Sequence, residues 1–374
     1  MRVALVVPGG VDRSLRDRVI PALLWLVEEL GRRNEVVVFA LGHGAVPGAW
    51  EIPGAHVVDL GGLRPSPVPG VALARRVAHL RRLLRAHGPF DLVHAFWATP
   101  CGAAAAAAAP SLPLVVSLAG GELASIPEIG YGCDLVPRER AKAAWALWRA
   151  AAVTAASEPL AAEARRRGYP ARVIPLGAEA AAFLAPLPRT PGPPFRLLHA
   201  ADLNRVKDTP TLLRAFGRLR ARGLDVGLDV AGEDTLGGVV QEEARRLGIA
   251  DAISFHGRLR TEELRPFFRA ADLLVLSSRH EAGPVVLMEA AACGVPTVGT
   301  AVGHVAEGHP LRALAVPVGD DPALARGIEE LLLDDARRHR MGEAALAWAR
   351  ANDAAATARR FSAIYTEVTG PGSA

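Results

Sequence analysis

The chain has 374 residues, more than one hydrophobic core usually spans, so we expect two domains. Half of the residues are hydrophobic and 22% are charged, which excludes a disordered protein, and the net charge of +4 is modest for this length. Three cysteines without close pairing fit a reduced, cytoplasmic protein rather than a disulfide framework or a zinc site. No uninterrupted apolar stretch reaches the roughly 18–20 residues of a membrane span.

The first half of the chain alternates short apolar runs with amphipathic helical patterns. The runs are apolar throughout, which is typical of parallel strands that helices cover on both faces. We expect amphipathic helices over residues 14–31 and 72–87. The expected strands cover residues 3–7, 35–40, 56–60, 91–96, 113–118, 153–156 and 172–176.

Residues 72–88 (ALARRVAHLRRLLRAHG) set arginines beside leucine and valine at helical spacing. This pattern gives a cationic face next to an apolar one. Two interpretations stay open: a solvated surface helix packed on the core, or an interfacial helix that touches anionic lipid. Nucleic-acid binding is not expected, because the stretch lacks interleaved aromatic residues and no recognition motif accompanies it. Trp145 and Trp148 are interpreted as core packing or an interface.

A second series of patterns follows a proline-rich stretch. Residues 183–195 (FLAPLPRTPGPPF) have no periodicity, which indicates a linker. The strands expected after it cover residues 195–201, 226–232, 253–257, 272–277, 296–300 and 314–318. The helices expected between them cover residues 209–222, 237–247, 261–270, 284–293 and 322–341.

The two series predict an α/β protein with two doubly wound, Rossmann-like domains. We expect them over residues 1–186 and 187–345, with a C-terminal helix over 346–374 that crosses back to the first domain. A hinge between such domains would leave a cleft between the carboxyl ends of the two sheets, where these folds bind ligands. Closure of the hinge would exclude water from that cleft.

Residues 277–300 (SSRHEAGPVVLMEAAACGVPTVGT) carry two acids in an apolar context, Glu281 and Glu289. A carboxylate is costly to bury among apolar side chains unless something there needs it. The helix is expected to begin at about Pro284, because proline is favoured at the first helical position, and to end at Cys293–Gly294. Glu281 therefore precedes the positive end of a helix that contains Glu289.

The start of this helix suits a diphosphate. Residues 283–286 lie at the positive end of the helix dipole, and apart from Pro284, which has no N–H, their backbone N–H groups (Gly283, Val285 and residue 286) are free. A carboxylate one to two turns away can accept hydrogen bonds from the hydroxyls of a ribose. The pattern favours a nucleotide-sugar site. The alternative is that Glu281 only caps the helix and that Glu289 is an ion-paired surface residue.

Glu281 and Glu289, separated by seven residues, resemble the E-x7-E element of retaining GT-B glycosyltransferases of the family 4 type. Residues 199–216 (HAADLNRVKDTPTLLRAF) are similar to that family's first C-domain strand, loop and helix, with Lys207 at the phosphate-binding lysine. Further similar segments are 7–10 (VPGG), 173–179 (VIPLGAE), 253–278 and 302–308 (VGHVAEG). The resemblance covers nearly the whole chain.

The resemblance implies roles for these residues. Glu289 would hold the ribose of the donor, and Glu281 would lie near the donor sugar and the diphosphate. Lys207 and a nearby arginine would neutralise the leaving diphosphate, so neither a metal ion nor another cofactor is expected. Gly9 and Gly10, without side chains, would let the first domain approach the donor closely.

The sequence departs from the family pattern at two places. The arginine of the G-R-L triplet is missing from the stretch Ala201–Leu203, and Arg205 is the candidate for the replacement cation. The second departure is in residues 114–123 (LVVSLAGGEL), where Ala119 stands at the place of a histidine that meets the donor sugar in related enzymes.

The residues around Ala119 leave two explanations open. Sugar recognition has shifted to Glu122, beside Gly120 and Gly121, or to His94, which at the end of a strand can equally be a structural histidine; alternatively, catalysis is weakened. We therefore expect a cytoplasmic retaining glycosyltransferase that moves a sugar from a nucleoside diphosphate to a hydroxyl acceptor (a glycan, a lipid or a small molecule). The alternative is a catalytically impaired nucleotide-sugar-binding partner protein in surface-polysaccharide assembly.

Overall fold

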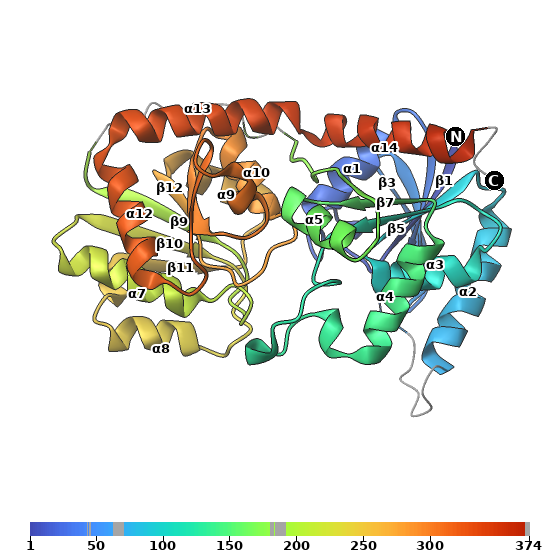
Figure 1. Cartoon of the computed structure of the whole chain (residues 1–374), viewed down its shortest axis with the longest axis horizontal. Helices are drawn as coiled ribbons and strands as arrows, with labels where there is room; N and C mark the ends of the chain where they lie inside the picture. The colour runs from blue at the N-terminus through green and yellow to red at the C-terminus, as the bar shows by residue number, and fades with distance from the viewer. Residues whose placement is uncertain (43, 45, 63–70, 180–182, 184–191, 371–374) are drawn as a thin grey trace. The chain divides into compact units, whose positions relative to one another are not determined.

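The computed structural model of the chain describes residues 1–370 except 43, 45, 63–70, 180–182 and 184–191 (Figure 1). The chain divides into two compact units: unit 1 is Met1–Gly177 with Ala354–Ala374, and unit 2 is Ala178–Asp353. Most of the expected linker, including the expected boundary after residue 186, lies outside the described residues. No helix in the described part of the chain is both long enough and apolar enough to cross a bilayer.

Unit 1 contains an eight-stranded sheet in the order β3-β4-β2-β1-β5-β6-β7-β8. All neighbouring strands pair in parallel except β3 and β4, which are antiparallel. The seven expected strands are confirmed, and the edge strand β3 was not expected because most of its residues are exposed. The strands are β1 (Arg2–Val7), β2 (Glu35–Ala40), β3 (Gly48–Ile52), β4 (Ala55–Asp59), β5 (Leu92–Phe96), β6 (Leu114–Leu118), β7 (Ala152–Ala155) and β8 (Ala171–Val173).

The main helices of unit 1 are α1 (Pro21–Gly31), α2 (Val71–His87), α3 (Ala103–Ala108), α4 (Pro137–Arg149), α5 (Glu158–Arg166) and α14 (Ala354–Thr369). Helix α3 packs between α2 and α4, so these three lie in one layer (Figure 1). Short turns of 3-10 or π type cover Ala98–Gly102, Pro127–Ile129 and Cys133–Leu135. The helix expected over 14–31 begins only at Pro21, because Leu15 and Arg18 have positive φ angles that an α-helix does not allow.

The C-terminal helix α14 belongs to unit 1 and packs against α1 (Figure 1). Its Thr357 Oγ1 donates to the carbonyl of Pro175 at 2.8 Å and accepts from the N–H of Gly177 at 3.1 Å. Its Glu367 forms a bidentate ion pair with Arg172 of β8. These contacts fasten the last helix to the end of the unit 1 sheet.

Unit 2 contains a six-stranded, fully parallel sheet in the order β11-β10-β9-β12-β13-β14. All six expected strands are confirmed: β9 (Phe195–Ala200), β10 (Val226–Ala231), β11 (Ile253–Gly257), β12 (Leu273–Leu276), β13 (Thr297–Thr300) and β14 (Ala313–Val316). The central strands β9 and β12 are buried almost throughout, which explains their continuous apolar runs.

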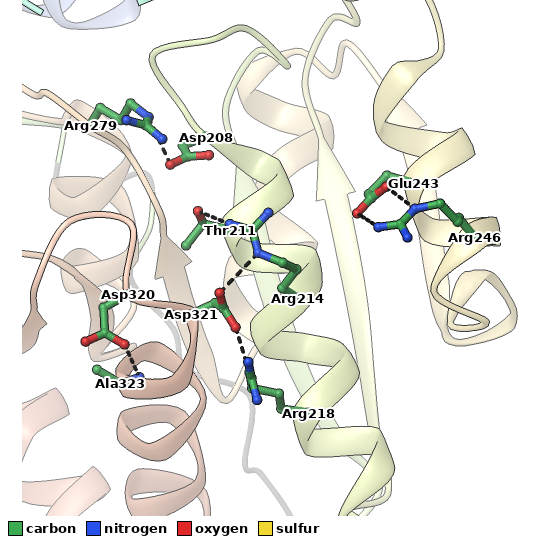
Figure 2. A network of polar contacts seen from close by, with 10 residues as sticks. All are labelled: Asp208, Thr211, Arg214, Arg218, Glu243, Arg246, Arg279, Asp320, Asp321 and Ala323. Carbon is green, nitrogen blue, oxygen red and sulfur yellow. Dashed lines mark hydrogen bonds and ion pairs between the residues drawn. The ribbon is translucent and has the colours of Figure 1, made fainter. Parts of the chain in front are cut away.

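The helices of unit 2 are α7 (Thr209–Ala221), α8 (Val239–Arg246), α9 (Thr261–Ala270), α10 (Val285–Ala292), α11 (Gly303–Gly308), α12 (Asp321–Leu333) and α13 (Asp335–Ala351). The single helix expected over 322–341 is two helices, because the Asp334 carboxylate accepts from the N–H of Arg337 and starts α13 anew. Figure 2 shows α7 joined to α12 through Asp321, which accepts from Arg214 Nε at 3.1 Å and from Arg218 Nε at 2.6 Å.

Candidate functional site

Lys207 and Glu281 meet at the carboxyl edge of the unit 2 sheet. Lys207 lies in the loop after β9 and Glu281 in the loop after the neighbouring strand β12. Lys207 Nζ donates to Glu281 Oε1 at 2.6 Å, and Ser278 Oγ donates to the same oxygen at 2.7 Å. The two ionic side chains are 23% and 11% exposed. The pair is therefore held in place but remains accessible to a ligand.

Further contacts join the β9 and β12 loops. The Arg279 guanidinium forms an ion pair with Asp208, with 3.1 Å between Nε and Oδ2 (Figure 2). The N–H of Arg279 donates to the carbonyl of Val206 at 2.7 Å, and Ser277 Oγ donates to the carbonyl of Lys207 at 2.8 Å. Asp208 has a left-handed backbone with φ of +46°, a conformation that costs a non-glycine residue free energy unless neighbouring contacts hold it. The loop that carries Lys207 is thus fixed by the loop that carries Glu281.

The N-terminus of α10 begins four residues after Glu281. Pro284 is the N-cap, so the helix starts one residue later than expected. The N–H groups of Val285 and Val286 have no intrahelical acceptor because they belong to the first turn. N–H groups of this kind, together with the positive end of the helix dipole, are able to bind an anion.

Helix α11 packs on the turn that contains Glu281. Its Gly303 has φ of +46°, and a Cβ atom there would lie 3.0 Å from both the carbonyl oxygen of Glu281 and Cδ of Pro284. Only glycine allows this approach without displacement of the turn. The segment 302–308 therefore supports the geometry of the loop that precedes α10.

Glu289 lies inside α10 and is 6% exposed. No group in the described part of the chain hydrogen-bonds to its carboxyl. Burial raises the pKa of Glu289 to about 8, although the nearby Arg265 guanidinium lowers it. The alternative of an ion-paired surface residue is wrong, because the side chain is buried and, among the described residues, unpaired. The carboxyl therefore keeps hydrogen-bonding capacity that no described residue uses.

His199, near the end of β9, is a candidate that sequence reasoning missed. Its ring is fully buried and Nδ1 donates to the carbonyl of Val275 at 2.9 Å, which leaves Nε2 as an acceptor with no partner in the described structure. Burial lowers the pKa of His199 to about 4, and the charges of Lys207 and Glu281 also act on it. A histidine in an otherwise apolar strand was the signal that could have found it.

Arg205 contacts neither Lys207 nor Glu281 among the interactions of the described residues. Its side chain is exposed, and no ion pair of Arg205 is found among the described residues. Its role as the replacement cation stays a prediction.

His94 is a structural histidine, and the prediction that it contacts a sugar is wrong. The ring has no exposed surface; its Nδ1 lies 2.7 Å from Tyr365 Oη and its Nε2 lies 2.7 Å from Ser117 Oγ. Burial lowers the pKa of His94 to about 3, so the ring is neutral. Both nitrogens are occupied by neighbours on β6 and α14, which leaves none for a ligand.

Glu122 also has a structural role, contrary to its predicted contact with a sugar or acceptor. Its side chain is 1% exposed and accepts from the N–H of Gly120 at 2.7 Å, of Ala119 at 3.2 Å and of Ala98 at 3.4 Å. These bonds close the loop after β6. The shift of sugar recognition to Glu122 or His94 is therefore not supported.

The glycines of unit 1 have packing reasons of their own. A Cβ atom at Gly120 would lie 2.6 Å from Trp97 Nε1, and one at Gly121 would lie 2.7 Å from Tyr131 Oη. Gly10, in the loop after β1, has φ of +81°, and a Cβ there would lie 2.6 Å from Ile20 Cγ1. Its neighbour Gly9 is half-buried at the same carboxyl edge. At Gly10, Gly120 and Gly121, packing against side chains of the same unit is enough to explain the glycine, so these residues do not by themselves identify a ligand.

No cluster of three or more histidine, cysteine, aspartate or glutamate side chains in the described ranges is arranged to hold a metal ion.

Two sequence families match the chain. The family described as Glycosyl transferases group 1 matches residues 188–348, and Glycosyltransferase Family 4 matches residues 23–181. The two matches are consecutive and together cover most of the chain.

Curated relatives match over parts of their length. The D-inositol 3-phosphate glycosyltransferase of Corynebacterium efficiens is 36% identical over 201 residues, which are 52% of this chain and 44% of that protein. The protein of the same name from Paenarthrobacter aurescens is 27% identical over 79% of this chain and 78% of its own. The N-acetyl-alpha-D-glucosaminyl L-malate synthase of Bacillus anthracis is 30% identical over 40% and 39% of the two chains. The matched part of the chain spans less than half the length of two of these relatives, the Corynebacterium efficiens and the Bacillus anthracis proteins.

Solved structures share the fold. A sucrose-phosphate synthase from Thermosynechococcus elongatus has a TM-score of 0.82 at 19% identity, with 98% of this chain and 99% of that chain covered. An α,α-trehalose-phosphate synthase (UDP-forming) from Burkholderia vietnamiensis has a TM-score of 0.80 at 17% identity, covering 100% and 98%. Anabaena Alr3699/HepE in complex with UDP and glucose has a TM-score of 0.73 at 18% identity, covering 97% and 99%. At these identities the likeness establishes a GT-B fold and not a substrate.

Proposed function

Because the chain belongs to the group 1 glycosyltransferases of the GT-B, family 4 type, we propose that it transfers a sugar from a nucleoside diphosphate sugar to a hydroxyl acceptor, with retention of the anomeric configuration. The observation that carries the proposal is the contact between Lys207 and Glu281 beside the N-terminus of α10. It brings a cation, a carboxylate and uncommitted backbone N–H groups to the carboxyl edge of one parallel sheet, where such sheets bind ligands.

Unit 2 is proposed to bind the donor. The diphosphate would accept hydrogen bonds from Lys207 and from the N–H groups of Val285 and Val286, and Gly283 would admit it close to the backbone. Glu281 would then turn from the ammonium toward hydroxyls of the donor sugar. The ribose hydroxyls would form hydrogen bonds with the Glu289 carboxyl, which has no partner among the described residues.

The proposed transfer breaks the bond between the anomeric carbon and the diphosphate oxygen. The acceptor hydroxyl oxygen bonds to the anomeric carbon from the face that the diphosphate leaves, and its proton passes to the departing phosphate oxygen. Negative charge grows on the diphosphate during this step. Lys207 and the start of α10 stabilise that charge more in the transition state than in the ground state, which is the source of the acceleration. Arg205 is the candidate for a second cation.

We propose that this transfer needs neither a metal ion nor another cofactor, since fixed cations and backbone amides provide the positive charge. Activity should then survive exhaustive treatment with a chelator. Loss of activity that added magnesium restores would contradict this part of the proposal.

Unit 1 is proposed to bind the acceptor, with Gly9 and Gly10 close to the donor. The curated relatives include proteins whose names contain D-inositol 3-phosphate and L-malate, so small polar acceptors should be tried first. Glycans and lipids with a free hydroxyl are the next classes.

We further propose that the protein works at the cytoplasmic face of the membrane, in peripheral contact through residues 72–88. In support, α2 has exposed Arg75, Arg82 and Arg85 and contains no acidic residue. Such a helix is attracted to anionic lipid and released by salt. Anionic liposomes should therefore bind the protein, and high salt should release it.

One assay tests the main proposal and its alternative together. Wild type and Glu281→Gln are incubated with UDP, GDP, ADP and TDP sugars, and both binding and donor turnover are measured. Turnover by wild type that the substitution abolishes supports the enzyme. Donor binding without turnover by any sugar or acceptor would favour the catalytically impaired binding protein.

A further inference from the structure

A cavity of about 630 Å³ lies at the amino edge of the unit 1 sheet. Its lining comes from the last turns of α2, the segment that leads into β5, and the segment between α3 and β6. In a parallel sheet this edge is opposite to the carboxyl edge, where Gly9, Gly10 and the β6 loop lie. The cavity is therefore separate from the proposed acceptor site.

The charged side chains that line the cavity are both arginines, Arg81 and Arg85. Arg81 donates to the carbonyls of Ala107 and Ala108 at the end of α3, which fixes its guanidinium and offsets the negative end of that helix dipole. Neither arginine forms an ion pair within the described part of the chain. The closest acid in sequence, Asp91, does not line the cavity, and its carboxylate accepts from the N–H of Arg2 at 2.8 Å. The cavity thus presents two unneutralised guanidinium groups.

Apolar side chains form the rest of the lining. Leu84 and Phe90 are buried beneath it, and Leu112 and Pro110 are on the opposite side. The carbonyl of Pro110 accepts from Arg149 Nη2 at 2.8 Å, which brings a third guanidinium to the loop that forms this side. An occupant that satisfies such a lining has an anionic group joined to an apolar body.

Helix α4, whose Arg149 reaches the loop that lines the cavity, favours a membrane as the source of that occupant. Helix α4 lies in the same layer as α2, with α3 between them. Trp145 and Trp148 on α4 are 40% and 75% exposed, so their interpretation as core packing is wrong. Exposed tryptophan together with arginine is the composition of surfaces that rest at a lipid–water interface.

We propose that the cavity between α2 and the α3–β6 loop binds the phosphate of an anionic membrane lipid, with Arg81 and Arg85 on the phosphate and Leu84, Phe90 and Leu112 against the glycerol and upper acyl chain. The inference rests on the proposed membrane contact of α2 and adds a defined headgroup site to it. Guanidinium groups bind phosphate oxygens in a bidentate manner, which suits a held headgroup better than a diffuse surface charge.

The test is binding of the full chain to phosphatidylglycerol-rich vesicles, with phosphatidylcholine vesicles as the reference. Ser111→Glu puts a carboxylate into the exposed rim of the cavity, and Ser111→Gln is the uncharged control of the same size. Arg85→Ala should weaken binding about fivefold, and Ser111→Glu at least as much. Ser111→Gln should bind as wild type does. Thermal unfolding of each variant checks that the fold is intact.

Arg82→Ala separates the cavity from the general contact, because Arg82 is exposed on α2 but does not line the cavity. If Arg82→Ala weakens vesicle binding as much as Arg85→Ala does, and Ser111→Glu binds as Ser111→Gln does, the cavity assignment is overturned and the α2 contact stands. If wild type binds no vesicles, both fall. Soluble glycerol phosphate is the remaining probe: its binding without vesicle binding overturns the lipid as the source of the phosphate.

Discussion

Lys207 Nζ lies 2.6 Å from Glu281 Oε1, although 74 residues separate them in sequence. In the proposed reaction the Lys207 ammonium binds the diphosphate and the Glu281 carboxylate binds the sugar. Without a donor these two charges neutralise each other directly. A bound diphosphate would compete with Glu281 for the ammonium group. The contact therefore doubles as a means to hold both side chains in place before the donor arrives.

Lys207→Met should lower kcat/KM for donor turnover by about 10²–10³-fold, because the leaving diphosphate loses a fixed cation. Arg205→Met removes an exposed cation from the same loop and should lower kcat/KM much less. Initial-rate kinetics of the two variants provide the comparison. A larger loss for Arg205→Met would reassign the principal cation to that residue.

Glu289→Gln should change the pH dependence of stability. Burial raises the folded-state pKa of Glu289 to about 8 from an ordinary value of 4.5. The native state therefore binds this proton more tightly than the unfolded state does. The free energy of unfolding is highest below pH 4.5, where both states are protonated, and it falls as the pH rises from 4.5 through 8.

Glutamine cannot ionise, so the variant escapes this loss. Relative to wild type, Glu289→Gln should gain at least about 2–4 °C in Tm between about pH 5 and about pH 9. If the difference in Tm between the two proteins did not change with pH across this range, the carboxyl would not be buried as described. Loss of donor binding in the variant at every pH is expected if the ribose uses this carboxyl.

Tyr365→Phe should destabilise the protein without an effect on turnover by the folded enzyme. The Tyr365 hydroxyl lies 2.7 Å from Nδ1 of the fully buried His94, and its removal leaves that nitrogen unsatisfied. The expected cost is about 1–3 kcal/mol, measured by urea unfolding. Tyr169→Phe is the control, since its hydroxyl has no hydrogen bond in the described part of the chain. Equal effects of the two substitutions would remove the argument for the buried network.

Gly303→Ala should raise the KM for the donor, because the added methyl group meets the Glu281 carbonyl and Pro284 at 3.0 Å and displaces the turn before α10. Gly319→Ala is the matched control: Gly319 also has a positive φ, of +78°, but a Cβ there meets nothing within 4 Å. Both variants should lose some stability from backbone strain, and only Gly303→Ala should change donor KM. A similar donor KM in both variants would show that α11 does not support the donor site.

The strand and helix pattern was readable from the sequence because each element carries its own periodicity. All thirteen expected strands formed, since continuous apolar runs such as those of β9 and β12 have no stable place except inside a covered parallel sheet. The antiparallel edge strand β3 escaped prediction because its residues are mostly exposed and carry no such run. The break between α12 and α13 escaped because the Asp334 cap acts within an otherwise continuous helical pattern.

The acids and the lysine of the candidate site were also readable, since their spacing and order resemble a known family. What the sequence did not decide was which polar residues are available to a ligand. His94 and Glu122 look like candidates in sequence, yet neighbours distant along the chain occupy their polar atoms. Conversely, Nε2 of His199 in β9 has no hydrogen-bond partner among the described residues, and this could be known only from the packed structure.

The sequence by itself determined the order of elements, the parallel sheets and the presence of an acid before and within one apolar helix. The tertiary structure alone decided that Lys207 meets Glu281 and that Glu289 is buried. The physical reason is that periodicity and turn chemistry are local, whereas burial and hydrogen-bond partners come from segments that the fold brings together from far apart.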